Sequence, residues 1–241
     1  MESWNNYTVV DLEMTGLAVK EDKIIEIGAV KVRDGQVTET YGMLVNPHRT
    51  IPEEIQQITG ITNEMVEHAM EPEEAIPGLL VFIGEDVIVG QNIIFDYSFL
   101  KQWAVNQKMQ LELKAYDTLK YARKLLPPEQ PKNLEALCSY YGIARENAHR
   151  ALDDAIETQQ IFAKMVEEIH TLGVDESWGE LLKPKVLQYK VKKQTPATKH
   201  QVEHLKEFRS LHHIEDPIEW ETLTRSQASR MMDQYYAKYG R

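Results

Sequence analysis

The sequence predicts an α/β fold, in which a mixed sheet is covered by helices and followed by a small helical appendage. Residues 23–47 have the β-branched composition of two strands joined at Asp34-Gly35. Further along, short apolar runs alternate with helix-like segments, a pattern typical of a helix-covered sheet. After residue 170, the chain changes to a lysine-rich stretch and then to amphipathic helical patterns.

The first half of this fold contains three predicted strands and three short helices. Residues 7–12 form a buried strand because they are apolar and β-branched, and residues 23–47 form a hairpin that ends at Asn46-Pro47. Short helices are predicted to follow Pro52, Thr62 and Glu71, with Thr62 as an N-cap.

The second half supplies two more strands, which makes the expected sheet five-stranded. Residues 86–92 form a strand that ends in Gly90, and Asp96 opens the next helix. The fifth strand lies near Ala115-Tyr116. The remaining helices are predicted at residues 117–126, about 133–141 and about 150–169, with prolines at 127, 128 and 131 breaking the chain.

We expect three regions: a main domain at residues 1–170, a linker at residues 171–197 and a helical unit at residues 198–241. The linker contains prolines and has six lysines in or beside it, namely Lys183, Lys185, Lys190, Lys192, Lys193 and Lys199. The helical unit has two capping-box patterns, which begin at Thr198 and Thr224, and each precedes a helix with one apolar face. Two helices alone bury little surface, so we expect this unit to be marginally stable.

Composition excludes several classes of protein. The single cysteine, Cys138, excludes an internal disulfide framework and a cysteine-based zinc site, and its apolar helical surroundings favour a buried structural thiol over a nucleophile. The first residues lack the pattern of a signal peptide, and no apolar run is long enough to span a membrane. We therefore expect a reducing, cytoplasmic setting and no membrane partner.

The charge is unevenly distributed along the chain. The net charge is −11, with −13 in residues 1–170 and +2 in residues 171–241. So acidic a domain cannot hold long duplex nucleic acid by phosphate neutralisation. It remains compatible with a short single-stranded end, because bound metal ions offset carboxylate charge and bases stack on apolar side chains.

Four acidic residues and one histidine carry most of the chemical information: Asp11, Glu13, Asp96, His149 and Asp154. The first two alternate after a strand, so their side chains point to the same face. A carboxylate at the end of such a strand lies where α/β sheets place their ligands. Clustered carboxylate oxygens suit Mg²⁺ or Mn²⁺ better than zinc.

Each of these residues also has an ordinary structural interpretation. An Asp-x-Glu pair is usually solvated surface, and Asp96 could cap a helix. His149 could be a polar loop residue, and Asp154, which follows Asp153 directly, could be an exposed acid in a first helical turn. Each motif is weak alone, but the three contexts VVDLEMTGL, VGQNIIFDYSFL and HRALDD, in this order, favour a functional site.

These contexts resemble the DEDD exonucleases that have a catalytic histidine, on the RNase H-like fold. Within them the chain is most similar to the DnaQ-like branch, the proofreading exonucleases of bacterial replicative polymerases. Residues 44–66 resemble that branch's segment between the first two motifs, and the likeness covers about residues 6–169. The resemblance implies a 3′→5′ exonuclease that releases nucleoside 5′-monophosphates.

The resemblance also implies roles for the five residues. Asp11, Glu13, Asp96 and Asp154 would hold two divalent cations, Mg²⁺ or Mn²⁺, and Asp11 would face both. His149 would be the general base, because a histidine ordinarily titrates near neutral pH. Without metal, we expect the clustered carboxylates to raise one another's pKa values.

Six further residues are implied as contacts with the substrate. The glycine of the loop after the first strand permits a close approach to the terminal nucleotide. The others would flank the last bases or touch the backbone, although Leu17 and Phe95 could equally be core. The expected contacts are Thr15, Gly16, Leu17, Ile61, Asn92 and Phe95.

Two departures from the branch leave the substrate open. Met14 stands where the branch commonly has threonine, and residues 11–17 match the oligoribonuclease version of this motif. The Ile-Thr-Gly-Ile segment instead resembles the proofreading branch, so we favour DNA over RNA. Gln91 stands where the branch often has histidine, and the sequence alone does not indicate the effect of this difference.

Three functions compete. The first is a metal-dependent 3′→5′ exonuclease on single-stranded DNA ends, used in proofreading or repair. The second is an exoribonuclease, and the third is a non-catalytic module that docks on a DNA polymerase, the candidate protein partner. The chain lacks a polymerase-sized region, so we expect a stand-alone exonuclease or a detachable subunit.

Overall fold

The computed structural model describes residues 4–145, 148–173, 178–191, 195–218, 220 and 223–240. The chain divides into two compact units, Met1–Val191 and Lys192–Arg241, which we describe separately. In the described residues, no helix is both long and apolar enough to span a lipid bilayer.

The first unit is built on a six-stranded mixed sheet with the order β3-β2-β1-β4-β5-β6. β1 pairs antiparallel with β2 and parallel with β4, and β5 is parallel to β4. The α/β prediction is confirmed, with a sixth strand added at the edge. The strands are β1 (Tyr7–Met14), β2 (Ile24–Arg33), β3 (Gln36–Leu44), β4 (Ile88–Gly90), β5 (Lys114–Asp117) and β6 (Lys185–Val186).

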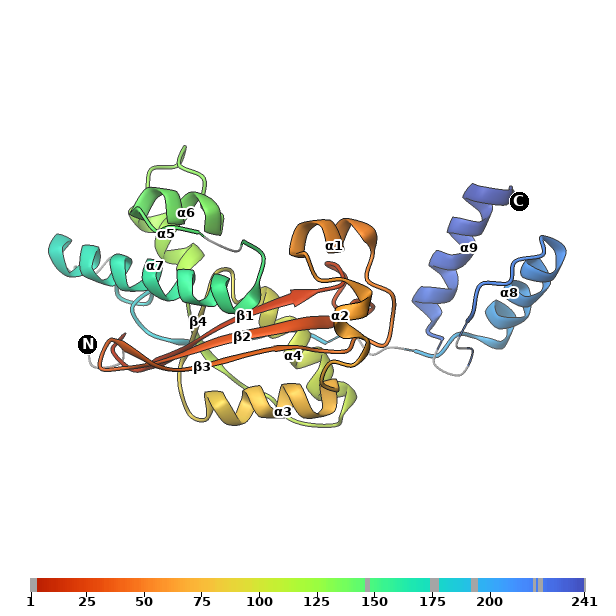
Figure 1. Cartoon of the computed structure of the whole chain (residues 1–241), viewed down its shortest axis with the longest axis horizontal. Helices are drawn as coiled ribbons and strands as arrows, with labels where there is room; N and C mark the ends of the chain where they lie inside the picture. Colours follow the sequence, from red (N-terminus) through yellow and green to blue (C-terminus); the bar gives the residue numbers. More distant parts are fainter. Residues whose placement is uncertain are drawn as a thin grey trace. The chain divides into compact units, whose positions relative to one another are not determined.

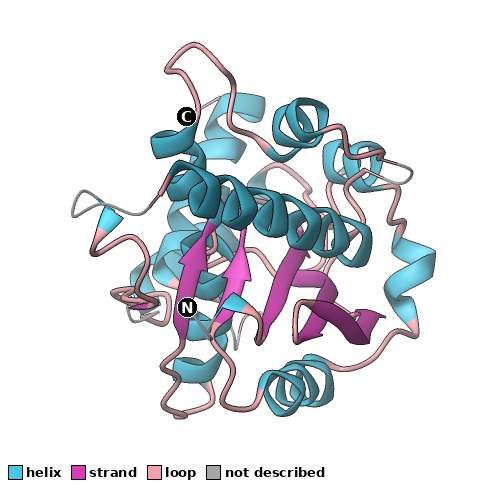
Figure 2. Cartoon of the chain, turned by 90° about the vertical axis from the view of Figure 1, so that its left-hand side faces the viewer, coloured by secondary structure: helices cyan, strands magenta, loops and turns pink. Residues whose placement is uncertain are grey.

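Helices cover both faces of this sheet (Figures 1 and 2). Alternate residues of β1 serve the two faces: Val9 packs in one buried cluster with α5, α6 and α7, and Val10 packs in another with α3 and α4. The helices are α1 (Glu53–Thr59), α2 (Asn63–Glu67), α3 (Pro72–Ile83), α4 (Ile94–Asn106), α5 (Thr118–Leu125), α6 (Leu134–Tyr141) and α7 (Ala151–Leu172).

Local signals in the sequence account for most of these boundaries. Asp34 and Gly35 have φ of 51° and 76°, the backbone that a tight two-residue hairpin turn requires. The side chains of Thr62 and Asn133 accept hydrogen bonds from backbone N–H groups at the starts of α2 and α6. Asp117 caps α5 in the same way, which ends β5 and begins the helix at one residue.

A close approach positions α7 against the sheet. A Cβ atom on Gly28 of β2 would lie 2.1 Å from the backbone carbonyl group of Ala151. Only glycine fits between the strand and the first turn of the helix. This contact brings the residues just before and after the start of α7 next to the strands β1 and β2.

The predicted linker needs a correction, because residues 178–191 belong to the first unit. Trp178 and Leu187 are each only 7% exposed and pack into the two clusters of the sheet. Lys185 and Val186 form β6 against β5. The lysines and Pro184 suggested solvent exposure, whereas the apolar side chains between them anchor the segment.

The second unit contains α8 (Lys199–Leu211) and α9 (Arg225–Tyr239). Both predicted capping boxes form, with Thr198 and Gln201 at α8 and Thr224 and Gln227 at α9. The predicted apolar faces meet in one cluster, with a buried core of Leu205, Phe208, Leu223, Ala228 and Met232.

Candidate active site

Asp11 and Glu13 lie two residues apart at the end of β1. Both are partly buried, and their register partners in β2 are Gly28 and Glu26. The pairing shifts between Glu13 and Met14, so the strand leaves its regular register directly after the second carboxylate. The two side chains share one face, as their spacing predicted.

Asp96 comes to this strand end from the first turn of α4. Its Oδ1 accepts a hydrogen bond of 3.0 Å from the backbone N–H of Leu12, the residue between the two β1 carboxylates. Asp96 is only 5% exposed and does not cap α4, which begins at Ile94 without a side-chain cap. The carboxylate therefore faces β1, and the capping alternative is excluded.

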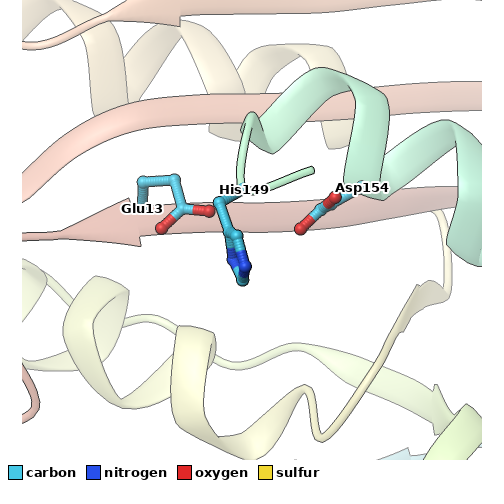
Figure 3. A group of neighbouring side chains, drawn as sticks. All are labelled: Glu13, His149 and Asp154. Atoms are coloured by element: carbon cyan, nitrogen blue, oxygen red, sulfur yellow. The ribbon is translucent and has the colours of Figure 1, made fainter. Parts of the chain in front are cut away.

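His149 and Asp154 reach the site from the start of α7. One ligand atom each of Glu13, His149 and Asp154 lie within 4.8 Å of one another (Figure 3). His149 has φ of 63°, an uncommon backbone for a residue other than glycine, and this turns its exposed side chain toward the carboxylates. Asp154 is 6% exposed, whereas its neighbour Asp153 is partly exposed.

Burial and mutual repulsion raise the pKa values of these carboxyl groups. Burial raises the pKa of Asp11 well above its usual range, and the charges of Asp96, Glu13 and Asp154 raise it further. Burial, followed by the charges of Asp154, Glu26 and Asp96, raises the pKa of Glu13 to about 8. Burial is also the main reason that the pKa of Asp96 rises to about 7.

This set of donors fits divalent cations. It contains several carboxylates that are held together although they repel one another, together with an imidazole, and oxygen-rich sites of this kind suit Mg²⁺ or Mn²⁺. A bound cation would offset the negative charge that burial makes unfavourable on Glu13 and Asp96. Asp11, Glu13, Asp96 and Asp154 are the residues that would hold it.

Arg145 supports Asp154 and was not expected from the sequence. Its Nη2 donates to Asp154 Oδ1 at 2.7 Å, and its Nε donates to Glu157 Oε2 at 2.7 Å. Glu157 is 4% exposed, so the guanidinium compensates two carboxylates on adjacent turns of α7. Burial raises the pKa of Asp154, and Arg145 opposes that rise. Nothing in the local sequence around Arg145 indicates this pairing.

A second ion pair fixes the other end of the segment that carries His149. Arg150 donates to both carboxylate oxygens of Glu26, at 2.7 to 3.2 Å. Glu26 also accepts from the backbone N–H of Ala151, the first residue of α7, at 2.9 Å. His149 therefore lies between two anchored arginines: Arg145, which pairs with Asp154 and Glu157 of α7, and Arg150, which pairs with Glu26 of β2. Glu26 lies in the predicted hairpin, but nothing in the local sequence indicates its pairing with Arg150.

The structure assigns a role to Gln91, which the sequence left open. Its Nε2 donates to the carbonyl of Lys132 at 2.7 Å, and its Oε1 accepts from the hydroxyl of Thr118 at 2.5 Å. The next residue, Asn92, has φ of 57°, and its N–H donates to Asp117 Oδ1 at 3.0 Å. Gln91 thus fixes the turn that presents Asn92 just before α4.

The loop after β1 presents Leu17 to solvent. Asp22 closes this loop by accepting from the Ala18 N–H at 2.8 Å and from the Thr15 hydroxyl at 3.0 Å. A Cβ on Gly16 would lie 2.5 Å from Asp22 Oδ2, so the glycine is required by Asp22 as well as being open to a ligand. Leu17 is 80% exposed, which argues against a core role.

The remaining expected contacts differ in their accessibility. Phe95 is partly exposed and packs edge-on against Phe99 at 5.4 Å. Ile61 is 0% exposed and lies in a cluster with Ile25, Ile51 and Val66. We therefore retain Phe95 and do not carry Ile61 forward as a nucleotide contact, because its side chain has no free surface.

The fold and the acidic site together define a nuclease of the RNase H-like class. The family model RNase_T, described as Exonuclease, matches residues 8–162, and the chain belongs to this exonuclease family. The predicted resemblance to DnaQ-like exonucleases is thereby confirmed.

Among curated relatives, the chain is 35% identical over 164 residues to the DNA polymerase III subunit epsilon of Aquifex aeolicus, across 68% of this chain and 81% of the relative. It is 40% identical over 170 residues to the PolC-type DNA polymerase III of Thermotoga petrophila, across 70% of this chain. The match spans only 12% of that polymerase.

Solved exonucleases share the fold. Exonuclease X in complex with 5′ overhanging duplex DNA is 26% identical, with a TM-score of 0.56 across 71% of this chain and 95% of that one. The nuclease domain of 3′hExo, a DEDDh family member bound to rAMP, has a TM-score of 0.61 at 17% identity, across 75% of this chain and 96% of that one. The latter likeness shows the fold alone.

Proposed function

We propose that the protein is a metal-dependent 3′→5′ exonuclease that removes nucleoside 5′-monophosphates from single-stranded DNA ends. The observation that carries the proposal is the convergence of Glu13, His149 and Asp154 within 4.8 Å, beside Asp11 and Asp96. A polymerase-docking module has no need for an imidazole among buried carboxylates.

Each residue has a distinct chemical task in this proposal. Asp11, Glu13, Asp96 and Asp154 would hold two divalent cations, Mg²⁺ or Mn²⁺. When bound, these cations would stabilise the developing charge on the attacking water and on the leaving 3′ oxygen. His149 would accept the proton of that water, and its exposed position allows the proton to pass to solvent.

Contacts beside the site would position the last nucleotide. Leu17 and Phe95 offer accessible apolar surface on which bases can stack, and Asn92 offers an exposed amide. Thr15 would hold the shape of the loop and would not contact the nucleotide through its hydroxyl, because that hydroxyl donates to Asp22. Relatives among DNA polymerase III components support DNA as the substrate and proofreading as the setting.

Exoribonuclease activity is the second candidate. The motif of residues 11–17 resembles oligoribonucleases, and the fold is shared with a nuclease domain bound to rAMP. RNA differs from DNA at each nucleotide by the 2′-hydroxyl, so the two candidates differ in sugar preference.

The test is a timed digestion of 5′-labelled single-stranded DNA and RNA of one sequence, with Mg²⁺, Mn²⁺ or chelator. We expect a ladder that shortens from the 3′ end, requires metal, is lost in Asp11→Ala and forms faster on DNA. A faster ladder on RNA would favour the exoribonuclease. No ladder on either substrate would favour the docking module.

A further inference from the structure

Five cations form an exposed surface on α5 and the segment that follows α7. Residues 117–125 and 178–185 contain five Lys and Arg and only two carboxylates, Asp117 and Glu180. The whole first unit, in contrast, has 18 Lys and Arg against 31 Asp and Glu. We call the five cations the basic face: Lys120, Arg123, Lys124, Lys183 and Lys185.

Tertiary contacts bring the two parts of the basic face together. The spacing of Lys120, Arg123 and Lys124 places all three on the exposed side of α5. Lys185 pairs with Ala115 across β5 and β6, directly before α5. The two segments are also joined because the Tyr121 hydroxyl donates to the Leu181 carbonyl at 2.8 Å.

Further contacts fix individual cations around this junction. Lys120, Lys183 and Lys185 line one small hollow of about 40 Å³, together with Asp117. Lys124 lies over the ring of Trp178, with 5.1 Å between its Nζ and the ring centroid. Cations from both segments therefore lie around one junction.

Asp117 links the basic face to Asn92 at the end of β4. Lys120 Nζ lies 3.8 Å from Asp117 Oδ2, and Asp117 Oδ1 holds the N–H of Asn92. Asn92 lies two residues before α4, which carries Asp96. β4 and β5 are parallel neighbours, so Asn92 and α5 both follow the carboxyl ends of strands at the same edge of the sheet.

We propose that the basic face binds the phosphates of the substrate's single strand on the 5′ side of the nucleotide being removed. The inference rests on the proposed function and adds a path for the strand beyond the last nucleotide. An acidic protein must bind a polyanion through a local concentration of cations, since its overall field repels the strand. Exposed lysine and arginine side chains supply this attraction without selecting a base sequence.

The test compares two variants with the same loss of charge. Arg123→Gln/Lys183→Gln/Lys185→Gln removes three exposed cations of the basic face. Lys120 and Lys124 are retained because they contact the buried side chains of Asp117 and Trp178, whereas Lys183 pairs with the exposed Glu180. The control removes three cations elsewhere in the first unit, as Lys31→Gln/Lys108→Gln/Lys164→Gln.

Each protein is assayed on a single strand of thirty nucleotides and on the p-nitrophenyl ester of thymidine 5′-monophosphate, which has one phosphate. For the basic-face variant, we expect KM on the long strand to rise about ten-fold and its salt slope to fall by about 2, the loss of three phosphate contacts. Hydrolysis of the ester stays within about two-fold of the unchanged protein.

Equal effects of the two triple variants on the long strand would overturn the inference, as would an equal loss on the ester. Strand affinity, measured by fluorescence anisotropy in Ca²⁺, separates this inference from the proposed function. A protein that binds through the basic face and hydrolyses neither substrate would disprove the function and retain the surface. If the basic-face variant hydrolyses its substrates and binds the strand with unchanged affinity, the proposed function stands and the basic face is not the binding surface.

Discussion

The sheet-based unit and the helical unit of this chain use charge in opposite ways. In the first unit, with a net charge of −13, acidic side chains from β1, α4 and α7 are brought together and partly buried. The second has 9 Lys and Arg against 7 Asp and Glu, and those that the structure describes remain at the surface around an apolar cluster. Burying several carboxylates close together costs stability. This cost indicates that the first unit keeps them together for a chemical function.

The largest effect is expected from a substitution of Asp154, and its neighbour Asp153 provides the control. Asp154→Ala removes a buried carboxylate that we propose as a metal ligand, and we expect exonuclease activity to fall at least about a thousand-fold. Asp153→Ala removes the same charge one residue earlier, and activity should stay within about three-fold. Steady-state rates on the long strand measure both, and similar losses would mean that net charge, and not geometry, matters.

The next effect concerns the support of Asp154. Arg145→Met leaves the buried Glu157 without its cation, and we expect a loss of about 3–5 kcal/mol in the free energy of unfolding. Arg145→Met/Glu157→Met should recover most of that stability while activity stays about 10- to 100-fold low, because Asp154 still lacks its partner. Denaturant unfolding and kcat on the ester separate the two quantities.

A purely structural role for Arg145 would be indicated if the double variant recovered activity together with stability. The control is Lys164→Met, which breaks an exposed pair with Glu167 on the same helix. Exposed pairs contribute little, so neither stability nor activity should change measurably.

The stability of the metal-free protein should fall as pH rises. The pKa of Glu13 is raised to about 8 and that of Asp96 to about 7, so the folded state holds protons that the unfolded state releases at lower pH. Their contribution is complete below pH 4 and is lost between about pH 4 and pH 8. We expect Tm in chelator to decrease from pH 5 to pH 8.

Added Mn²⁺ should raise Tm most at pH 8, where it competes with the fewest protons. Glu13→Gln cannot ionise, so its Tm should depend less on pH. A Tm in chelator that increases over this range would contradict the raised pKa values.

The smallest effects are expected in the helical unit. Thr198→Ala and Thr224→Ala each remove a capping box, and each should cost about 1 kcal/mol in the stability of α8 and α9. Hydrolysis of the ester should not change, because the five candidate site residues all belong to the first unit. Hydrogen exchange of the α8 and α9 amides measures the first effect. A slower ester reaction would mean that the helical unit affects catalysis.

A hypothesis from the charge contrast is that the helical unit also holds nucleic acid. The lysines of the predicted linker would act with this unit under that hypothesis, but the structure assigns Lys183, Lys185 and Lys190 to the first unit. If unfolding α8 and α9 through the cap substitutions raises KM on the long strand, the helical unit contributes to binding. An unchanged KM leaves that role to the basic face.

The sequence was informative wherever a local signal is sufficient. The hairpin at Asp34-Gly35 and the two capping boxes were predicted because turns and caps depend on residues a few positions apart. The position of residues 178–191 was not predictable in this way. Leu187 and Trp178 contact side chains more than 15 residues away, and their anchoring is invisible beside the exposed lysines.

By itself the sequence determined the α/β class and indicated the five candidate site residues, because strand periodicity and the three motif contexts are local properties of the chain. Tertiary structure alone decided how those residues are held. The pairing of Arg145 with Asp154 and Glu157, that of Arg150 with Glu26, and the removal of Ile61 from the surface each depend on packing between distant segments. Such contacts form only when loops close and the clusters on both faces of the sheet bury their side chains, so no short stretch of sequence encodes them.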